Sequence, residues 1–86
     1  MKIVFHKNFE RQYKKLPEKV KTRIKDRNLF FEKDPYNLLL NNHALKGTYA
    51  GCRSFNITGD IRIIYKLLSD DSALFMTIGS HSKLYQ

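Results

Sequence analysis

The side chains that could carry chemistry gather in the second half of this 86-residue chain. They include imidazoles, a carboxylate, guanidinium groups, amines, an amide and a phenol: His43, Lys46, Arg53, Asn56, Asp60, Arg62, His81, Lys83 and Tyr85. Cleavage of RNA without a metal needs such a set. A base takes the proton from the 2′-OH, a cation stabilises the charge on phosphorus, and an acid protonates the departing 5′ oxygen. An aromatic ring can stack on a base of single-stranded RNA.

The first half of the chain is predicted to form a strand followed by a helical hairpin. Residues 2–6 are β-branched and aromatic, which is typical of a short strand. Asn8 is expected to cap a helix, and apolar residues then recur at helical spacing up to Leu16. Pro17 suits the first turn of a second helix, which Pro35 ends because the residue before a proline avoids the helical region.

The second half is predicted to be a loop followed by a meander of strands. The loop covers residues 36–48, and Gly79 is expected to end the last strand ahead of a polar tail. The three strands are expected at residues 52–57, 61–68 and 73–78, separated by turn sequences. The order β-α-α-β-β-β indicates an α+β fold with a helical hairpin packed on a mostly antiparallel sheet. In such a fold the loop, one hairpin turn and the tail can meet at one edge of the sheet.

The chain is strongly basic, with sixteen Lys and Arg against eight Asp and Glu, a formal charge of +8. Residues 1–34 hold eleven of the basic and five of the acidic side chains. This excess favours a polyanionic partner such as nucleic acid or an acidic protein. A basic surface that serves solubility alone is the alternative interpretation, and it applies above all to the lysines of the hairpin.

The sequence also excludes several classes of protein. Residues 1–86 are predicted to form one domain, because the chain is too short to build two cores. No stretch approaches the ~18 apolar residues of a membrane span, and the amino end lacks a leader's apolar middle. A single cysteine, Cys52, favours a cytoplasmic protein without disulfides. No metal site and no cofactor is expected, since no phosphate-binding glycine loop, H-E-x-x-H or paired cysteine motif occurs.

Three motifs follow one another in the second half: H-A-L-K-G, then G-C-R-S-F-N-I-T-G-D-I-R-I-I-Y-K-L, then L-F-M-T-I-G-S-H-S-K-L-Y. In this order and spacing they resemble the RelE/ParE toxin superfamily, and most closely its YafQ-like branch of ribosome-dependent mRNA interferases. The resemblance extends over the whole chain in the order of elements and over residues 43–85 in its motifs.

The resemblance implies a role for five residues. His43 matches an active-site histidine of the YafQ type, and Asp60 matches the carboxylate at the β-hairpin. Arg62 matches the arginine that RelE-type enzymes use on the scissile phosphate. His81 matches the histidine proposed as the general acid, and Tyr85 matches the terminal aromatic position. Each has a structural alternative as a polar loop, turn, edge or packing residue.

Three positions depart from the family's pattern. Asn56 stands where these sequences carry another histidine, Ile61 where they carry tryptophan, and Thr77 where they carry arginine. These three differences remove a titratable group, a stacking surface and a phosphate-binding group. We expect them to affect the activity of a nuclease and its codon preference. Separately from the resemblance, Lys46, Arg53, Asn56 and Lys83 are predicted to contact RNA.

The resemblance therefore implies a toxin of a type II toxin–antitoxin system that cuts mRNA in the ribosomal A site and inhibits translation. Its expected partners are the ribosome, mRNA and a cognate acidic antitoxin, with no membrane and no small-molecule cofactor. One alternative is a ParE-like toxin without nuclease activity that binds and inhibits DNA gyrase. Another is a passive RNA-binding module. The histidines and the aspartate around an arginine favour the nuclease, because a gyrase binder has no need of them.

Overall fold

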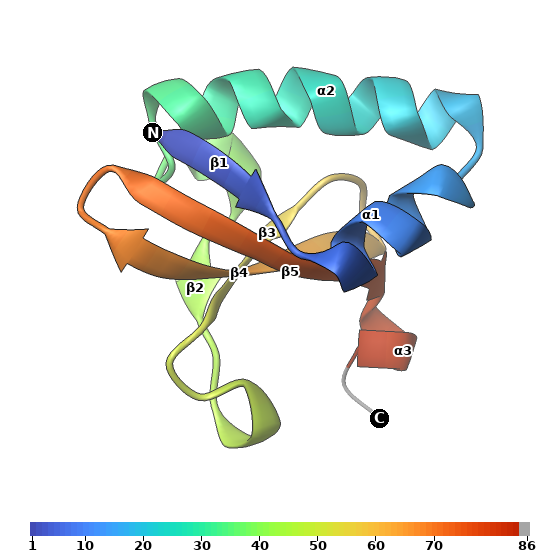
Figure 1. Cartoon of the computed structure of the whole chain (residues 1–86). Coiled ribbons are helices and arrows are strands. Elements are labelled where there is room, and N and C mark those ends of the chain that lie inside the picture. The colour runs from blue at the N-terminus through green and yellow to red at the C-terminus, as the bar shows by residue number, and fades with distance from the viewer. Residues whose placement is uncertain (85–86) are drawn as a thin grey trace.

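The computed structural model describes residues 1–84, so the prediction for Tyr85 lies outside the described residues. The helices and strands are β1 (Lys2–Phe5), α1 (Lys7–Lys14), α2 (Glu18–Lys33), β2 (His43–Ala44), β3 (Arg53–Asn56), β4 (Ile61–Ser69), β5 (Ser72–Ser80) and α3 (His81–Leu84). Two 3₁₀ turns, η1 (Leu38–Leu40) and η2 (Gly47–Tyr49), interrupt the segment between α2 and β3. Helix α2 lies across one side of the sheet, whereas η2 and α3 project from the other side (Figure 1).

The strands form one sheet in the order β1-β5-β4-β3-β2. Strand β1 is parallel to β5, and the other neighbours are antiparallel. This confirms the predicted α+β fold with a mostly antiparallel sheet.

Aromatic rings build the core between the sheet and α2. Phe31 of α2 packs against Phe55, Tyr65 and Phe75 of three successive strands, with ring centroids 4.8, 4.9 and 5.2 Å away. All four side chains are fully buried. Burial of each such side chain stabilises the fold by roughly 1.5–3 kcal/mol, so this cluster anchors α2 to the sheet.

The hairpin of α1 and α2 forms as predicted, but its capping differs at the first helix. His6, rather than Asn8, is the N-cap of α1, and its Nδ1 accepts a hydrogen bond from the Asn8 backbone N–H at 3.0 Å. Imidazole is not among the usual capping side chains, which is why the sequence pointed to Asn8 instead. Pro17 is the N-cap of α2, one position before its expected place, and α2 ends before Pro35 as predicted.

The meander contains two elements that the sequence did not predict. Strand β2 is only two residues long, too short to produce an alternating pattern, and it pairs with β3. Gly79 does not end β5: it lies opposite Arg62, and the ladder continues to Ser80 opposite Ile61. The residues that follow form α3 in place of the expected structureless tail.

Candidate active site

The strand register places several predicted site residues on one face of the sheet. Side chains of residues directly opposite each other on neighbouring strands share a face, and successive residues alternate. Phe55 and Ile63 face the helices, so their neighbours along the strands face away from them. Asn56 lies opposite Arg62, and His43 lies opposite Ser54, so all four are on the side from which η2 and α3 project (Figure 1).

Arg62 is held at this face by one hydrogen bond, and one of its buried N–H donors has no partner within residues 1–84. Its Nη1 donates to Asn56 Oδ1 at 2.8 Å, and its Nε is buried with no hydrogen-bond partner within residues 1–84. No carboxylate in this part of the chain forms an ion pair with it. Ser54 Oγ is also buried, and it has no hydrogen-bond partner among the described residues. A buried, unpaired donor is costly, and a bound anion such as a phosphate would relieve that cost.

Asp60 and His81 meet at the end of the sheet next to Arg62. The backbone N–H of His81 donates to the Asp60 carbonyl at 3.0 Å and approaches Asp60 Oδ1 at 3.3 Å. Thr58 Oγ1 accepts from the backbone N–H groups of Asp60 and Ile61, at 3.3 and 3.0 Å, which fixes the turn. The start of α3 is therefore attached to the β3–β4 turn. The His81 side chain is exposed to solvent.

His43 is oriented by a backbone hydrogen bond. Its Nδ1 lies 2.9 Å from the carbonyl oxygen of Asn41, a residue in the left-handed region with φ of 48°. A carbonyl oxygen only accepts, so Nδ1 carries the hydrogen in this bond. In the neutral ring Nε2 then keeps its lone pair, which is the protonation state that a general base needs.

The remaining predicted RNA contacts are dispersed. Arg53 shares the helix-facing side of the sheet with Phe55, donates from Nε to Asn42 Oδ1 at 2.8 Å, and packs its guanidinium on the Tyr36 ring at 5.2 Å. The Arg53 side chain therefore lies on the opposite face of the sheet from Arg62 and contacts Asn42 and Tyr36. Lys46 precedes η2 and Lys83 lies in α3, both exposed, so each is on an element that projects on the Arg62 side of the sheet.

Asn42 is a structural residue of the site region that the sequence did not single out. Its Nδ2 donates to the Tyr65 hydroxyl and to the Pro35 carbonyl, both at 2.7 Å, and its Oδ1 accepts from Arg53. These bonds attach the segment before His43 to the core. Burial raises the pKa of the Tyr65 hydroxyl, an effect larger than the opposing hydrogen bond from Asn42. The sequence predicted only that Asn42 lies in a loop, and nothing in its local pattern indicated these hydrogen bonds.

Gln12 of α1 is the second such residue. Strand β1 covers the edge of β5 only as far as Phe75. Beyond that point, Gln12 Oε1 accepts from the Ile78 backbone N–H at 2.9 Å and from Thr77 Oγ1 at 3.0 Å. Thr77, one of the departures from the family's pattern, thus helps to join α1 to β5. Asn56, another departure, positions Arg62.

The described residues do not include a group of three or more His, Cys, Asp or Glu side chains that could hold a metal ion. None of the helices in residues 1–84 is long and apolar enough to cross a membrane.

Solved structures identify the fold. YafQ from E. coli strain BL21(DE3) superimposes with a TM-score of 0.81 at 22% identity, over 98% of this chain and 97% of that chain. The YoeB/ParE toxin from Agrobacterium tumefaciens gives 0.77 at 24% identity, over 94% and 99%. The archaeal RelE–RelB complex from Pyrococcus horikoshii OT3 gives 0.75 at 20% identity, over 95% and 96%. The fold is therefore that of the RelE/ParE-like toxins.

The sequence assigns the family within this class. Residues 1–86 match the profile of the bacterial toxin of type II toxin–antitoxin systems, YafQ. The chain belongs to the YafQ toxin family, which confirms the resemblance seen in its motifs. No curated protein sequence matches it at a significant level.

Proposed function

We propose that this YafQ-family toxin is a ribosome-dependent endonuclease that cleaves mRNA in the ribosomal A site without a metal and thereby inhibits translation. The observation that carries the proposal is the environment of Arg62. A guanidinium held by Asn56, with a buried and unpaired Nε, is suited to binding the scissile phosphate and the charge that develops on it. Its position beside the Asp60–His81 contact supplies titratable groups next to that phosphate.

The proposed reaction is an intramolecular transesterification. The 2′ oxygen attacks phosphorus as a base removes its proton, the bond to the 5′ oxygen breaks, and an acid protonates the departing oxygen. His43, whose Nδ1 is bonded to the Asn41 carbonyl and whose Nε2 is left for the substrate, is the proposed base, and His81, whose backbone is bonded to Asp60, is the proposed acid. The products are a 2′,3′-cyclic phosphate and a 5′-hydroxyl. Tyr85 is a further candidate for proton transfer, and Lys46 and Lys83 are proposed to contact phosphates.

The ribosome is proposed as an essential partner because a single guanidinium, that of Arg62, is proposed to bind the scissile phosphate, whereas Arg53 is engaged by Asn42 and Tyr36. Positioning of the substrate by a larger body is worth many orders of magnitude in rate, and mRNA in the A site is already positioned. We also propose that an acidic antitoxin neutralises the toxin in the cytoplasm. A solved E. coli DinJ–YafQ toxin–antitoxin complex supports this partner, together with the charge of +8.

The proposal is tested by inducing the protein in bacterial cells and mapping mRNA 5′ ends. New ends inside translated codons, an early stop in labelled amino-acid incorporation, and activity that persists in EDTA with purified ribosomes are the expected results. Arg62→Ala is expected to slow cleavage about 10²–10³-fold, as loss of a charge-stabilising donor does. Lys66→Ala, an exposed residue of the same strand, is the matched control. Early DNA breaks with intact mRNA would contradict the proposal.

A further inference from the structure

One side of α2 faces away from the sheet, and no other helix or strand of the described chain lies over it (Figure 1). Asp26, Leu29, Phe30 and Lys33 repeat there at helical spacing and line one hollow of about 350 Å³. We call these four residues the outer face of α2. Leu29 and Phe30 keep 59% and 43% of their surface exposed, although both are large and apolar. An exposed apolar surface with a polar rim is typical of a site that another molecule covers.

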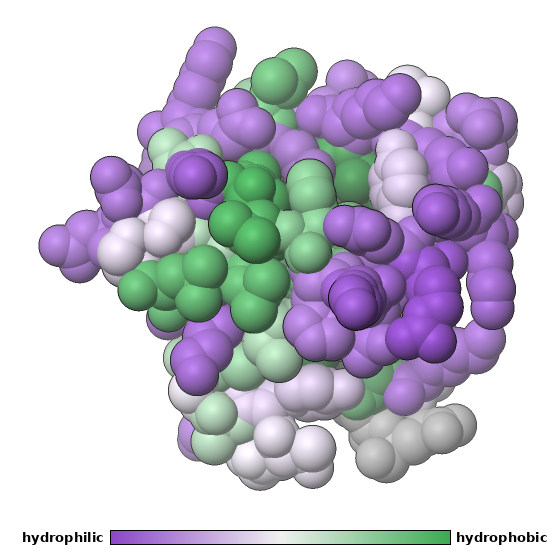
Figure 2. Space-filling model, viewed as in Figure 1, coloured by the Kyte–Doolittle hydropathy of each residue, from purple (hydrophilic) through white to green (hydrophobic). Residues whose placement is uncertain are grey.

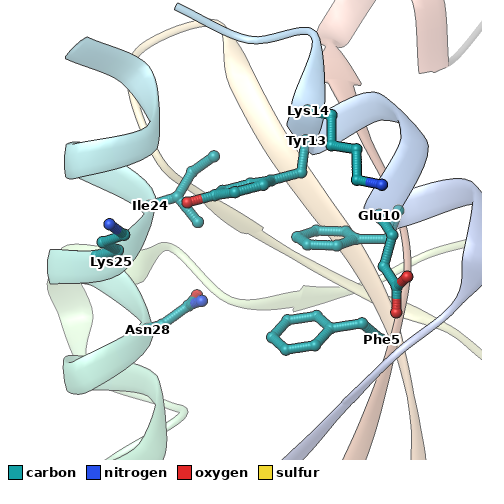
Figure 3. A pocket seen from close by; sticks show the side chains of 8 residues that line it. Phe5, Glu10, Tyr13, Lys14, Ile24, Lys25 and Asn28 are labelled. Atoms are coloured by element: carbon teal, nitrogen blue, oxygen red, sulfur yellow. The ribbon is translucent and has the colours of Figure 1, made fainter. Parts of the chain in front are cut away.

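The outer face is separate from the pocket on the sheet side of the helix. Ile24, Lys25 and Asn28 of α2 line that pocket together with rings of β1 and α1 (Figure 3). None of the four outer-face residues lines it. Figure 2 shows hydrophobic surface where β1 lies beneath α2, and also at the outer edge of the molecule over α2. The helix therefore presents two different surfaces, and the outer face belongs to α2 alone.

The charges around the outer face are balanced, unlike those of the rest of the hairpin. Residues 25–34 hold three basic and three acidic side chains, whereas residues 1–24 hold eight basic and two acidic. Asp26 and Lys33 are both exposed, and neither forms an ion pair within residues 1–84. They are two helical turns apart, about 10 Å along the axis, and do not pair with each other. Each charge is therefore available to another molecule.

We infer that the outer face binds a second copy of this chain, with the two α2 helices antiparallel around a two-fold axis between Leu29 and Phe30. A two-fold interface must be self-complementary, because every contact across it occurs twice with the copies exchanged. Asp26 lies three residues before Leu29, and Lys33 lies three residues after Phe30. The axis therefore places Asp26 of each copy opposite Lys33 of the other. The Leu29 and Phe30 side chains of both copies meet at the centre.

One flank of this helix pair is complementary as well. Lys25 and Glu32 lie on the same flank of the outer face, and both are exposed without an ion pair within residues 1–84. In an antiparallel pair the same flanks of the two helices are neighbours, which brings Lys25 of one copy near Glu32 of the other. A parallel pair would instead place Asp26 opposite Asp26 and Lys33 opposite Lys33. The charge pattern thus favours the antiparallel arrangement.

A polyanion fits the outer face less well than a second copy does. The Asp26 carboxylate repels an RNA phosphate, and it repels an acidic segment of an antitoxin equally. The unbalanced positive charge that such partners need lies in residues 1–24. Since Arg62 faces the other side of the sheet, both copies keep it uncovered, and the inference does not depend on whether the toxin cleaves RNA.

The test measures self-association of the full chain by sedimentation equilibrium. One face of a 16-residue helix is smaller than the roughly 800 Å² per partner of a stable complex, so the dimer is expected to be weak. The expected dissociation constant lies between about 1 µM and 1 mM. Asp26→Lys and Lys33→Asp should each raise it on the order of tenfold, because like charges then face each other. Lys66→Asp and Asp70→Lys, at exposed positions outside α2, are the matched controls and should leave it unchanged.

The two variants together give the more specific result. In an equimolar mixture, Asp26→Lys meets Lys33→Asp with opposite charges facing each other, so the mixture should associate as strongly as the parent. A parent that stays monomeric up to about 1 mM, or a mixture no stronger than its components, would overturn the inference. So would loss of antitoxin or ribosome binding in the single variants with self-association unchanged, because a different partner would then occupy the outer face.

A cross-link checks the arrangement without altering charge. Leu29→Cys should form a disulfide between two copies under mild oxidation, because the two side chains lie next to the axis. Thr22→Cys is the control, exposed on the same helix, and its two copies lie on the order of 20 Å apart in the antiparallel pair. Cys52 is buried, so the introduced thiol is the one that reacts. Cross-links from Thr22→Cys alone would contradict the antiparallel dimer.

Discussion

At the scale of single residues, the site differs from its relatives' pattern in a way that the structure explains. Asn56 replaces an expected histidine, but its amide oxygen accepts the hydrogen bond that orients Arg62. Asparagine at this position therefore holds Arg62 in place, although it offers no titratable group. This leaves two candidate imidazoles in the described chain: His43 in β2, on the same face of the sheet as Arg62, and His81 at the start of α3.

His81→Ala is expected to slow single-turnover cleavage of mRNA on the ribosome about 10²–10⁴-fold. The 5′ oxygen must leave with a proton, and imidazole, with an ordinary pKa near 6.5, donates one efficiently at neutral pH. Binding to mRNA-programmed ribosomes should be nearly unchanged, because both hydrogen bonds to Asp60 come from the backbone N–H of His81, which alanine keeps. Ser82→Ala, its exposed neighbour, is the control. Cleavage at the parent rate by His81→Ala would assign the acid to Tyr85, His43 or the ribosome.

At the scale of elements, the sequence predicted the helices and strands that have a regular pattern of apolar residues. It did not predict the residues whose role depends on one hydrogen bond to a distant part of the chain. Strand β1, the hairpin and the long strands follow from apolar periodicity, which many residues reinforce. The role of Asn42 depends on Tyr65, 23 residues away, and that of Gln12 on Ile78, 66 residues away. No local pattern marks such residues. The residues of the candidate site were predicted from motifs. The face of the sheet on which Asn56 and Arg62 lie is established only by the register of β3 and β4.

Asn42→Ala is expected to lower the free energy of unfolding by about 1–3 kcal/mol, because the buried Tyr65 hydroxyl and the Arg53 Nε both lose their partner. Urea denaturation measures the change, and Thr48→Ala in the exposed part of η2 is the control. Combining Asn42→Ala with Tyr65→Phe should cost less than the sum of the two single changes, since both remove the same bond. Strict additivity would show that this hydrogen bond does not attach the segment to the core.

Burial of the Tyr65 hydroxyl predicts a dependence of stability on alkaline pH. Burial raises the pKa of Tyr65 in the folded state, so the folded protein binds this proton more tightly than the unfolded chain does. The resulting stabilisation is complete below a pH of about 10, the ordinary pKa of tyrosine, and is lost as the pH rises above it. Tyr65→Phe should show a smaller decrease in unfolding free energy between pH 9 and 11 in urea denaturation. Parallel pH profiles for the two proteins would contradict this.

At the scale of the whole molecule, charge is distributed unequally between the two layers. The segment that forms β1 and the hairpin carries eleven of the sixteen basic residues, and the rest of the chain carries the candidate site. Helix α2 and Arg62 lie on opposite sides of the sheet. The basic hairpin and the proposed phosphate-binding site at Arg62 are thus separate parts of the protein, and the proposed role of each can be tested separately.

Ribosome affinity is expected to fall steeply with salt, and the hairpin should account for most of the dependence. Each cation that neutralises an RNA phosphate contributes roughly 0.7–0.9 to the slope of log affinity against log salt. Replacing Lys15 and Lys19 by Gln should lower that slope by about 1.4–1.8 if both contact ribosomal RNA. Replacing Lys46 and Lys66, which lie outside the hairpin, should lower it less. Sedimentation with purified ribosomes at several salt concentrations measures the slopes, and single-turnover cleavage of bound mRNA should be similar in the parent and the Lys15/Lys19 variant. An unchanged slope for that variant would mean that the basic hairpin serves the antitoxin or solubility instead of the ribosome.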